Sequence, residues 1–197
     1  CEDKTYVAQT KAVQDIEAYA RRDQGRPKRD ARVGMLPPKL AQTIVNLATG
    51  PLLPSDKEVI LDPFCGTGVV LQETLLMGYG AYGTDIEPRM IDFTRQNLDW
   101  LTEGKPAHNV TLEVGDATTH QWASPFTTVA CETYLGRPLS SWPDEATLRD
   151  IMETCNTIIK KFLANLAGQC PTGTRLCLAV PSWRDPSGTN HHLRFLD

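Results

Sequence analysis

The distribution of hydrophobic residues divides the chain near residue 35. Residues 1–35 are mostly polar, and apolar residues follow a helical spacing only around Val13, Ile16 and Tyr19. From residue 36 onward, short apolar runs alternate with segments in which apolar residues recur every three or four positions. We therefore predict a polar and basic N-terminal arm, residues 1–35, followed by one folded domain, residues 36–197.

Within this domain, five short runs have the length and composition of β-strands. They lie at residues 59–61, 81–84, 110–114, 127–130 and 175–180. Helical spacing predicts four helices in the same domain. The first runs from Pro37-Pro38 to Gly50-Pro51, with Leu40, Ile44, Val45 and Leu47 on one face, and the others span residues 69–76, 87–101 and 143–166.

The alternation of strands and helices predicts an α/β fold, with a doubly wound, mostly parallel sheet covered on both faces. The last segment, residues 186–197, contains no convincing pair of strands. We therefore expect the sheet to lack a closing hairpin in this chain. We also expect His191 and His192 to lie in a loop or tail, where adjacent residues are poorly placed to share a metal.

The composition is that of an ordinary globular protein, with 41% hydrophobic and 22% charged residues. No apolar run approaches the roughly 20 residues of a membrane helix. The six cysteines form no C-x-x-C pair, and no Cys/His cluster has zinc spacing. These features favour a reducing compartment, the cytoplasm, and no structural metal. Because the chain does not begin with Met, we expect it to be a fragment of a longer protein.

Positive charge is concentrated in the arm, although the net charge of the chain is −4. A domain that binds nucleic acid alone usually has a basic excess. The basic cluster comprises Arg21, Arg22, Arg26, Lys28, Arg29 and Arg32. It is either a solvated, partly mobile arm or an edge that contacts phosphates beside an active site.

A glycine-containing turn, Asp62-Pro63-Phe64-Cys65-Gly66-Thr67-Gly68, joins the first strand to the next helix. Such turns lie at the carboxyl ends of parallel strands, where ligands bind. Gly66 and Gly68 allow a sharp turn and close approach of a ligand, and free N–H groups at the helix start can meet a carboxylate. Asp62 can accept a hydrogen bond from an ammonium group. The turn therefore predicts a site for S-adenosylmethionine (SAM).

Other cofactor loops fit this turn less well. A dinucleotide loop needs G-x-G-x-x-G, and Leu71 occupies the place of the third glycine. A phosphate-binding P-loop needs G-K-[ST], which the chain lacks.

Carboxylates also follow the next two strands. Asp85 can bind both ribose hydroxyls, and Asp116 can accept from the adenine amino group. Ile86 and Ala117 are predicted to sandwich the adenine. A single Asp at a strand end is commonly an N-cap or Asx-turn, but three at successive strand ends favour the cofactor.

The chain resembles a known family over residues 19–136. The similarity is carried by Gly34-Met35-Leu36-Pro37-Pro38-Lys39-Leu40-Ala41, Asn46-Leu47-Ala48, the residue 62–68 turn, Gly83-Thr84-Asp85-Ile86 and Asn97-Leu98. These segments look like the THUMP-associated RNA methylases, which include tRNA guanosine N2-methyltransferases. The resemblance implies a Rossmann-like methyltransferase fold, SAM as methyl donor, tRNA as partner, and a separate RNA-binding domain upstream.

Members of this family usually carry D-P-P-Y after the fourth strand, whereas this chain has Cys131-Glu132-Thr133-Tyr134. We predict that Glu132 and the backbone carbonyl of Cys131 hold the exocyclic amine, while Tyr134 stacks on a flipped base. Alternatively, Glu132 is a solvated carboxylate and Tyr134 packs on the sheet edge. A Cys131 nucleophile, as in pyrimidine-C5 methyltransferases, is disfavoured because Ala130 stands where those enzymes have Pro.

The predicted function is SAM-dependent methyl transfer to an exocyclic base nitrogen of RNA, with N2 of a tRNA guanosine as the best assignment. Two alternatives stay open. A DNA amino-methyltransferase would share the D-P-P-Y type of site, and a SAM-binding module without catalysis would tolerate the altered motif.

Overall fold

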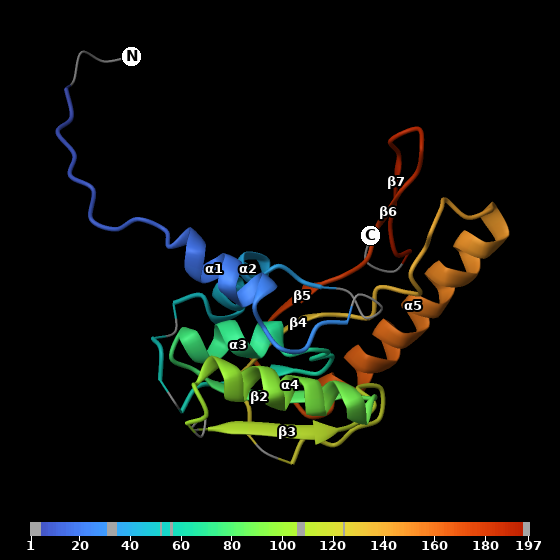
Figure 1. Ribbon diagram of the computed structural model, residues 1–197. Coiled ribbons are helices and arrows are strands. Elements are labelled where there is room, and N and C mark those ends of the chain that lie inside the picture. Colours follow the sequence, from blue (N-terminus) through green and yellow to red (C-terminus); the bar gives the residue numbers. More distant parts are fainter. Residues whose placement is uncertain are drawn as a thin grey trace.

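A five-stranded sheet forms the centre of the computed structural model, which describes residues 5–30, 35–51, 53–55, 57–105, 109–123 and 125–194 (Figure 1). Its strands are β1 (Val59–Asp62), β2 (Gly80–Asp85), β3 (Val110–Val114), β4 (Thr128–Glu132) and β5 (Arg175–Ala179). Their order is β3-β2-β1-β4-β5, and all neighbouring pairs are parallel. Because β2 and β4 flank β1 on opposite sides, the end of β1 is a switch point where ligands bind. Cys1, Arg32 and Gly34 lie outside the described residues.

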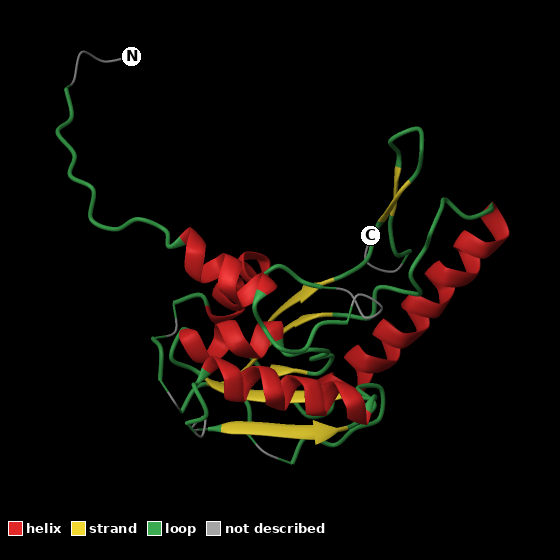
Figure 2. Cartoon of the chain, viewed as in Figure 1, coloured by secondary structure: helices red, strands yellow, loops and turns green. Residues whose placement is uncertain are grey.

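Helices cover both faces of the sheet, as Figure 2 shows. Helices α2 (Pro38–Thr49), α3 (Val69–Leu76) and α4 (Pro88–Leu101) pack on one face, and α5 (Glu145–Ala167) packs on the other. Consecutive residues of β1 serve these two layers: Ile60 packs with α2 and α3, whereas Leu61 packs with Phe162 of α5. Both side chains are fully buried. The predicted doubly wound α/β fold is therefore confirmed.

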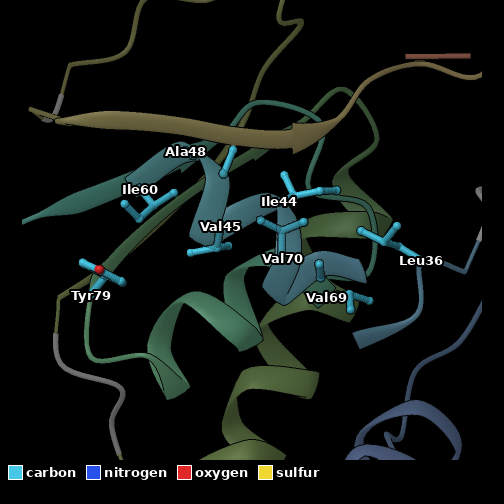
Figure 3. Packing of buried hydrophobic residues seen from close by; sticks show 10 residues of the cluster. Leu36, Ile44, Val45, Ala48, Ile60, Val69, Val70 and Tyr79 are labelled. Atoms are coloured by element: carbon cyan, nitrogen blue, oxygen red, sulfur yellow. The ribbon is translucent and has the colours of Figure 1, made fainter. Parts of the chain in front are cut away.

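Helix α2 turns a face of small and branched side chains toward the sheet (Figure 3). The residues of this face are Ala41, Ile44, Val45 and Ala48. The prediction that Leu40 and Leu47 share it is wrong, because these side chains are 47% and 64% exposed. They stand seven residues apart, so they share a neighbouring stripe of the helix that faces solvent.

After β5 the chain forms a separate antiparallel hairpin of β6 (Trp183–Arg184) and β7 (Asn190–His191). Residues 186–197, where we predicted no strand pair, contain only β7 of this hairpin, because β6 precedes them; the prediction that His191 lies in a loop is wrong. The turn is closed by Asp185, whose Oδ1 accepts from the N–H groups of Ser187 and Thr189, each at 2.9 Å. The hairpin does not join the main sheet, so β5 is an edge strand in the described part of the chain. No described helix is long and apolar enough to cross a membrane.

Candidate active site

The turn after β1 borders a small cavity of about 40 Å³. Its walls come from the turn itself, the first turn of α3, the end of β4 and the segment before α2: Leu36, Asp62, Phe64, Cys65, Gly66, Thr67, Val69, Val70 and Glu132. The structure thus brings Glu132 to the predicted cofactor turn. Of the residues predicted to hold the methyl acceptor, Glu132 therefore lines the same cavity as Asp62 and the turn that follows it.

The two glycines of this turn have different roles. Their φ angles of 52° at Gly66 and 82° at Gly68 lie in the left-handed region that favours glycine. A Cβ at Gly68 would also lie 2.7 Å from Cγ2 of Thr94, so close packing on α4 excludes any side chain there. A Cβ at Gly66 would meet nothing within 4 Å. Gly66 therefore leaves space free beside the cavity that it lines.

Two buried side chains of α4 form hydrogen bonds with the backbone of the turn. Oγ1 of Thr94 donates to the carbonyl oxygen of Gly66 at 2.8 Å, and Nδ2 of Asn97 donates to that of Thr67 at 2.8 Å. Both residues are fully buried. We did not predict these roles from the sequence; the inclusion of Asn97 in a segment that carried the resemblance was the available signal.

Asp85 at the end of β2 helps to shape the same turn. Its Oδ2 accepts from the N–H of Gly66 and its Oδ1 accepts from the N–H of Glu87, both at 2.9 Å. The second bond is the Asx-turn considered as the simpler alternative, yet a carboxylate retains acceptor sites for ribose hydroxyls. The N–H of Gly68 donates to the backbone carbonyl oxygen of Cys65. The N–H groups of Gly66 and Gly68 are therefore paired within the protein, which leaves those of the first turn of α3, at the helix start, for the predicted contact with a ligand carboxylate.

The carboxyl groups around the cavity are electrostatically unusual. Burial raises the pKa of Asp62 well above its ordinary value, the N–H of Phe64 lowers it, and the charges of Asp85 and Glu132 raise it further. Burial also raises the pKa of Asp85 and of Glu132. A positively charged ligand would offset the cost of ionising these groups together. SAM fits this requirement, because it carries an ammonium and a sulfonium group.

The predicted contact between Asp62 and the SAM ammonium implies a pH dependence of cofactor binding. In the free protein, the raised pKa keeps Asp62 protonated at pH values where an ordinary Asp is ionised. In the complex, the SAM ammonium would favour the ionised form. Affinity for SAM should therefore rise as pH increases through the raised pKa and fall below it. Calorimetric titrations from pH 5 to 8 test this, with Asp62→Asn expected to bind more weakly and with a flatter pH profile. An unchanged profile in that variant would remove Asp62 from the ammonium site.

The adenine end of the predicted site is only partly assembled. Ile86 is 62% exposed, so its side chain is available to an adenine. Asp116 is also exposed, and its Oδ1 accepts from both the N–H and the hydroxyl of Thr118 at 2.8 Å. Ala117, in contrast, is 3% exposed and packs in the core beside α5. The roles of these residues stay predictions, and Ala117 is the one whose side chain faces away from solvent.

The aromatic and sulfur side chains of the turn pack inward. The ring of Phe64 meets Phe162 of α5 edge to face, with centroids 5.0 Å apart. Cys65 is buried beneath α3 and α4. Phe64 and Cys65 thus support the turn from inside, while each also contributes to the cavity wall.

The segment that replaces D-P-P-Y is anchored by Thr133. Its N–H and its hydroxyl both donate to the carbonyl oxygen of Ala179 on β5, at 2.9 and 3.0 Å. Glu132 before it is half-buried on the cavity wall, and Tyr134 after it is 37% exposed. Cys131 is fully buried, and burial followed by the charge of Asp62 raises the pKa of its thiol well above the ordinary value. A thiolate nucleophile at Cys131 is therefore disfavoured.

The described part of the arm is attached to the domain by polar contacts. Helix α1 (Ile16–Gln24) packs near α2, and Nε of Arg22 lies 2.6 Å from Oε1 of Glu73 on α3. The backbone N–H and carbonyl of Lys28 bond the side-chain amide of Asn97, each at 2.9 Å. Since Asn97 also bonds the predicted cofactor turn, the arm and the turn share one anchor. Residues 22–28 are therefore bound to the helical layer rather than solvated freely.

Breaking the contact between Arg22 and Glu73 should destabilise the protein. The Glu73 side chain is 1% exposed and that of Arg22 is 14% exposed. Arg22→Ala should lower the free energy of unfolding by about 2–3 kcal/mol, because it leaves the Glu73 carboxylate buried without its partner. This loss is somewhat smaller than for a fully buried pair, since Arg22 is partly exposed. Urea denaturation measures this loss. The double variant with Glu73→Gln should recover part of it, and a loss that is the same with or without Glu73→Gln would show that the pair is not coupled.

Comparison with known proteins supports a methyltransferase. Residues 8–96 match the family model described as DNA methylase. The chain is 49% identical over 65 residues to a tRNA (guanine(10)-N2)-dimethyltransferase of Methanothermobacter thermautotrophicus, covering 33% of this chain and 18% of that protein. It is 38% identical over 90 residues to the protein of the same name from Pyrococcus abyssi, covering 46% and 24%. The chain thus spans less than a quarter of the length of these two relatives.

Solved structures share the fold at low sequence identity. A possible methylase from Clostridium difficile 630 aligns with a TM-score of 0.56 and 17% identity, over 75% of this chain and 45% of that one. TrmN from Thermus thermophilus aligns with a TM-score of 0.52 and 20% identity, over 73% and 38%. These comparisons confirm the predicted Rossmann-like methyltransferase fold and the predicted resemblance to tRNA guanosine N2-methyltransferases.

Proposed function

We propose that this chain, a methyltransferase domain that uses SAM, transfers a methyl group to an exocyclic base nitrogen of RNA, with N2 of a tRNA guanosine as the target. The observation that carries the proposal is the shared cavity, where Glu132 reaches the turn after β1. The names of the two relatives support the choice of tRNA. Such a substrate also fits a cytoplasmic protein, in keeping with the free state of the five described cysteines.

Bound SAM would supply an electrophilic methyl group, so the protein must mainly position and desolvate the amine. We assign Glu132 and the carbonyl oxygen of Cys131 as acceptors for the two N–H groups of the amine. This arrangement turns the nitrogen lone pair toward the methyl group. Tyr134, partly exposed next to Glu132 in sequence, is assigned to stack on the base. Thr133 fixes the spacing between them through its two bonds to Ala179.

An upstream RNA-binding domain would account for how a domain of net charge −4 reaches tRNA. Under this proposal that domain contributes most phosphate contacts, and the catalytic domain contributes the base site. The basic residues of the arm would add a smaller, salt-dependent share.

The proposal is tested by methyl transfer from tritiated SAM with the full-length protein, using total tRNA, genomic DNA and no nucleic acid as acceptors. We expect label in tRNA, and nucleoside analysis should recover N2-methylated guanosine. Label only in DNA would contradict RNA as substrate and favour the DNA reading that the family description suggests. SAM binding without transfer to any acceptor would favour a binding module instead.

A further inference from the structure

A second, larger hollow of about 630 Å³ lies between α5 and the C-terminal hairpin, outside the cofactor site. In Figure 1, α5 extends well past the sheet, and the hairpin β6–β7 rises beside its overhanging end. One wall is a face of α5 with Leu148, Met152 and Asn156, and the other holds His191, His192 and Arg194. We call this hollow the α5 groove.

The walls of the α5 groove are held by a packed core. Trp183 and Leu193, 9% and 1% exposed, pack on Ile151 and Cys155 of α5. In the hairpin, Asp185 pairs with Nε2 of His191 at 3.0 Å in addition to its turn bonds. The groove is therefore a preformed feature of the fold, because both of its sides are fixed before any ligand binds.

The chemistry inside the α5 groove is mixed. Leu148 and Met152 supply apolar surface, and Oδ1 of Asn156 is buried without a hydrogen-bond partner among the described residues. A buried amide oxygen without a protein partner can accept from a water molecule or from an N–H donor of a ligand. Trp142 does not line the groove itself, but its ring lies 5.8 Å from that of His191, which does, and is 38% exposed. Apolar surface, an unmet acceptor and an exposed aromatic ring together match a flat heterocycle that carries an amino group.

Charge in the α5 groove favours a nucleobase over a bare phosphate. Arg149 is neutralised by Glu145 at 2.8 Å, and Glu153 also lines the groove, so the lining carries no net positive charge. Arg194 is exposed at one end and is the cation best placed to meet a backbone phosphate. A ligand with an uncharged base and a single phosphate beside it therefore fits better than a multiply charged anion.

The α5 groove is linked to the segment that holds the proposed acceptor site. A Cβ at Gly136, two residues after Tyr134, would lie 3.0 Å from Cγ2 of Ile151 and 3.3 Å from Sγ of Cys155. The segment at residues 132–136 and the α5 groove thus both contact α5, at the edge of the sheet where β4 and β5 end.

We propose that the α5 groove binds an unpaired base of the RNA substrate next to the base that is methylated. This inference rests on the proposed function, since it takes RNA as the substrate. The base stacks on Trp142 and His191, its amino group donates to Oδ1 of Asn156, and its phosphate meets Arg194. The groove would thereby select RNA in which the neighbour of the target is unstacked.

The test uses the full-length protein with the variants Trp142→Ala, Asn156→Ala and Arg194→Ala, and Thr157→Ala on the exposed side of α5 as control. Each groove variant should raise KM for tRNA roughly 5- to 100-fold, the scale of one lost stacking contact, with kcat and SAM affinity little changed. Thr157→Ala should behave as wild type. Unchanged KM in all three groove variants would overturn the proposal, as would a protein partner seated there with RNA affinity intact.

A direct binding measurement separates this proposal from the proposed function. Single-stranded RNA oligonucleotides should quench the fluorescence of Trp142, and the quench should vanish in Trp142→Phe. If the protein methylates no RNA but this quench is present, the proposed function fails and the groove assignment survives. If tRNA is methylated without any quench assigned to Trp142, the groove assignment fails alone.

Discussion

Replacing Glu132 by Gln is expected to lower the rate of methyl transfer to RNA by about 10²- to 10⁴-fold, the range for losing a positioned acid–base group. Glu132 is half-buried on the wall of the cavity beside the turn after β1, and burial raises the pKa of its carboxyl group. The amide of Gln matches the carboxylate in shape but accepts less strongly and presents an N–H to the amine. Single-turnover assays measure the rate, and calorimetry should find SAM affinity nearly unchanged.

Glu87→Gln serves as the matched control, because Glu87 is an exposed carboxylate at the same edge of the sheet. It should retain full activity. Tyr134→Ala should also lower transfer while sparing SAM binding, because stacking on the base is lost. Full activity of Glu132→Gln would reject its assignment as the acceptor for the amine. In wild type the raised pKa predicts that activity falls as pH decreases through a value above the ordinary one for Glu, and Glu132→Gln should lose that limb.

Gly66→Ala is expected to weaken SAM binding by about 10- to 100-fold, the scale of overpacking a fitted site with one methyl group. Nothing in the protein lies within 4 Å of the added Cβ, so any clash must come from the ligand. The φ of 52° also costs the protein about 1 kcal/mol of stability as Ala. Titration with SAM and thermal unfolding measure the two effects separately.

Gly104→Ala is the control for this experiment. Gly104 has a φ of 74°, its Cβ would also meet nothing within 4 Å, and it lies after α4, away from the cavity. It should lose similar stability but bind SAM normally. Equal SAM affinity in Gly66→Ala and wild type would mean that the cofactor does not approach the turn at Gly66.

The elements of the fold could be predicted from the sequence because each carries its own periodicity. Helix α3 and strand β3 begin and end where their patterns predicted. The buried face of α2 was harder, because Leu40 and Leu47 are more hydrophobic than the alanines that are buried in their place. The hairpin β6–β7 has only two residues per strand, too few for a period to be visible, and its turn is closed by the side chain of Asp185.

The candidate site divides in the same way. The positions of Asp62, Asp85 and Glu132 at strand ends follow from the strand pattern, since parallel strands end at one edge. The contacts of Asn97 and Arg22 could not be predicted, because they join residues 69 and 51 positions apart by polar groups. Hydrophobic periodicity contains no information on such pairs. The arm is attached to the domain through these polar contacts. The apolar residues Val13 and Ile16 did not indicate them, because both side chains are exposed and take no part in the attachment.

The account depends on a SAM site at the end of β1, and calorimetric titration of the full-length protein tests that site most directly. SAM and its demethylated product should each bind at one site, and NAD and ATP should compete with neither. The absence of binding heat with both sulfur compounds, or displacement of SAM by a dinucleotide, would contradict it.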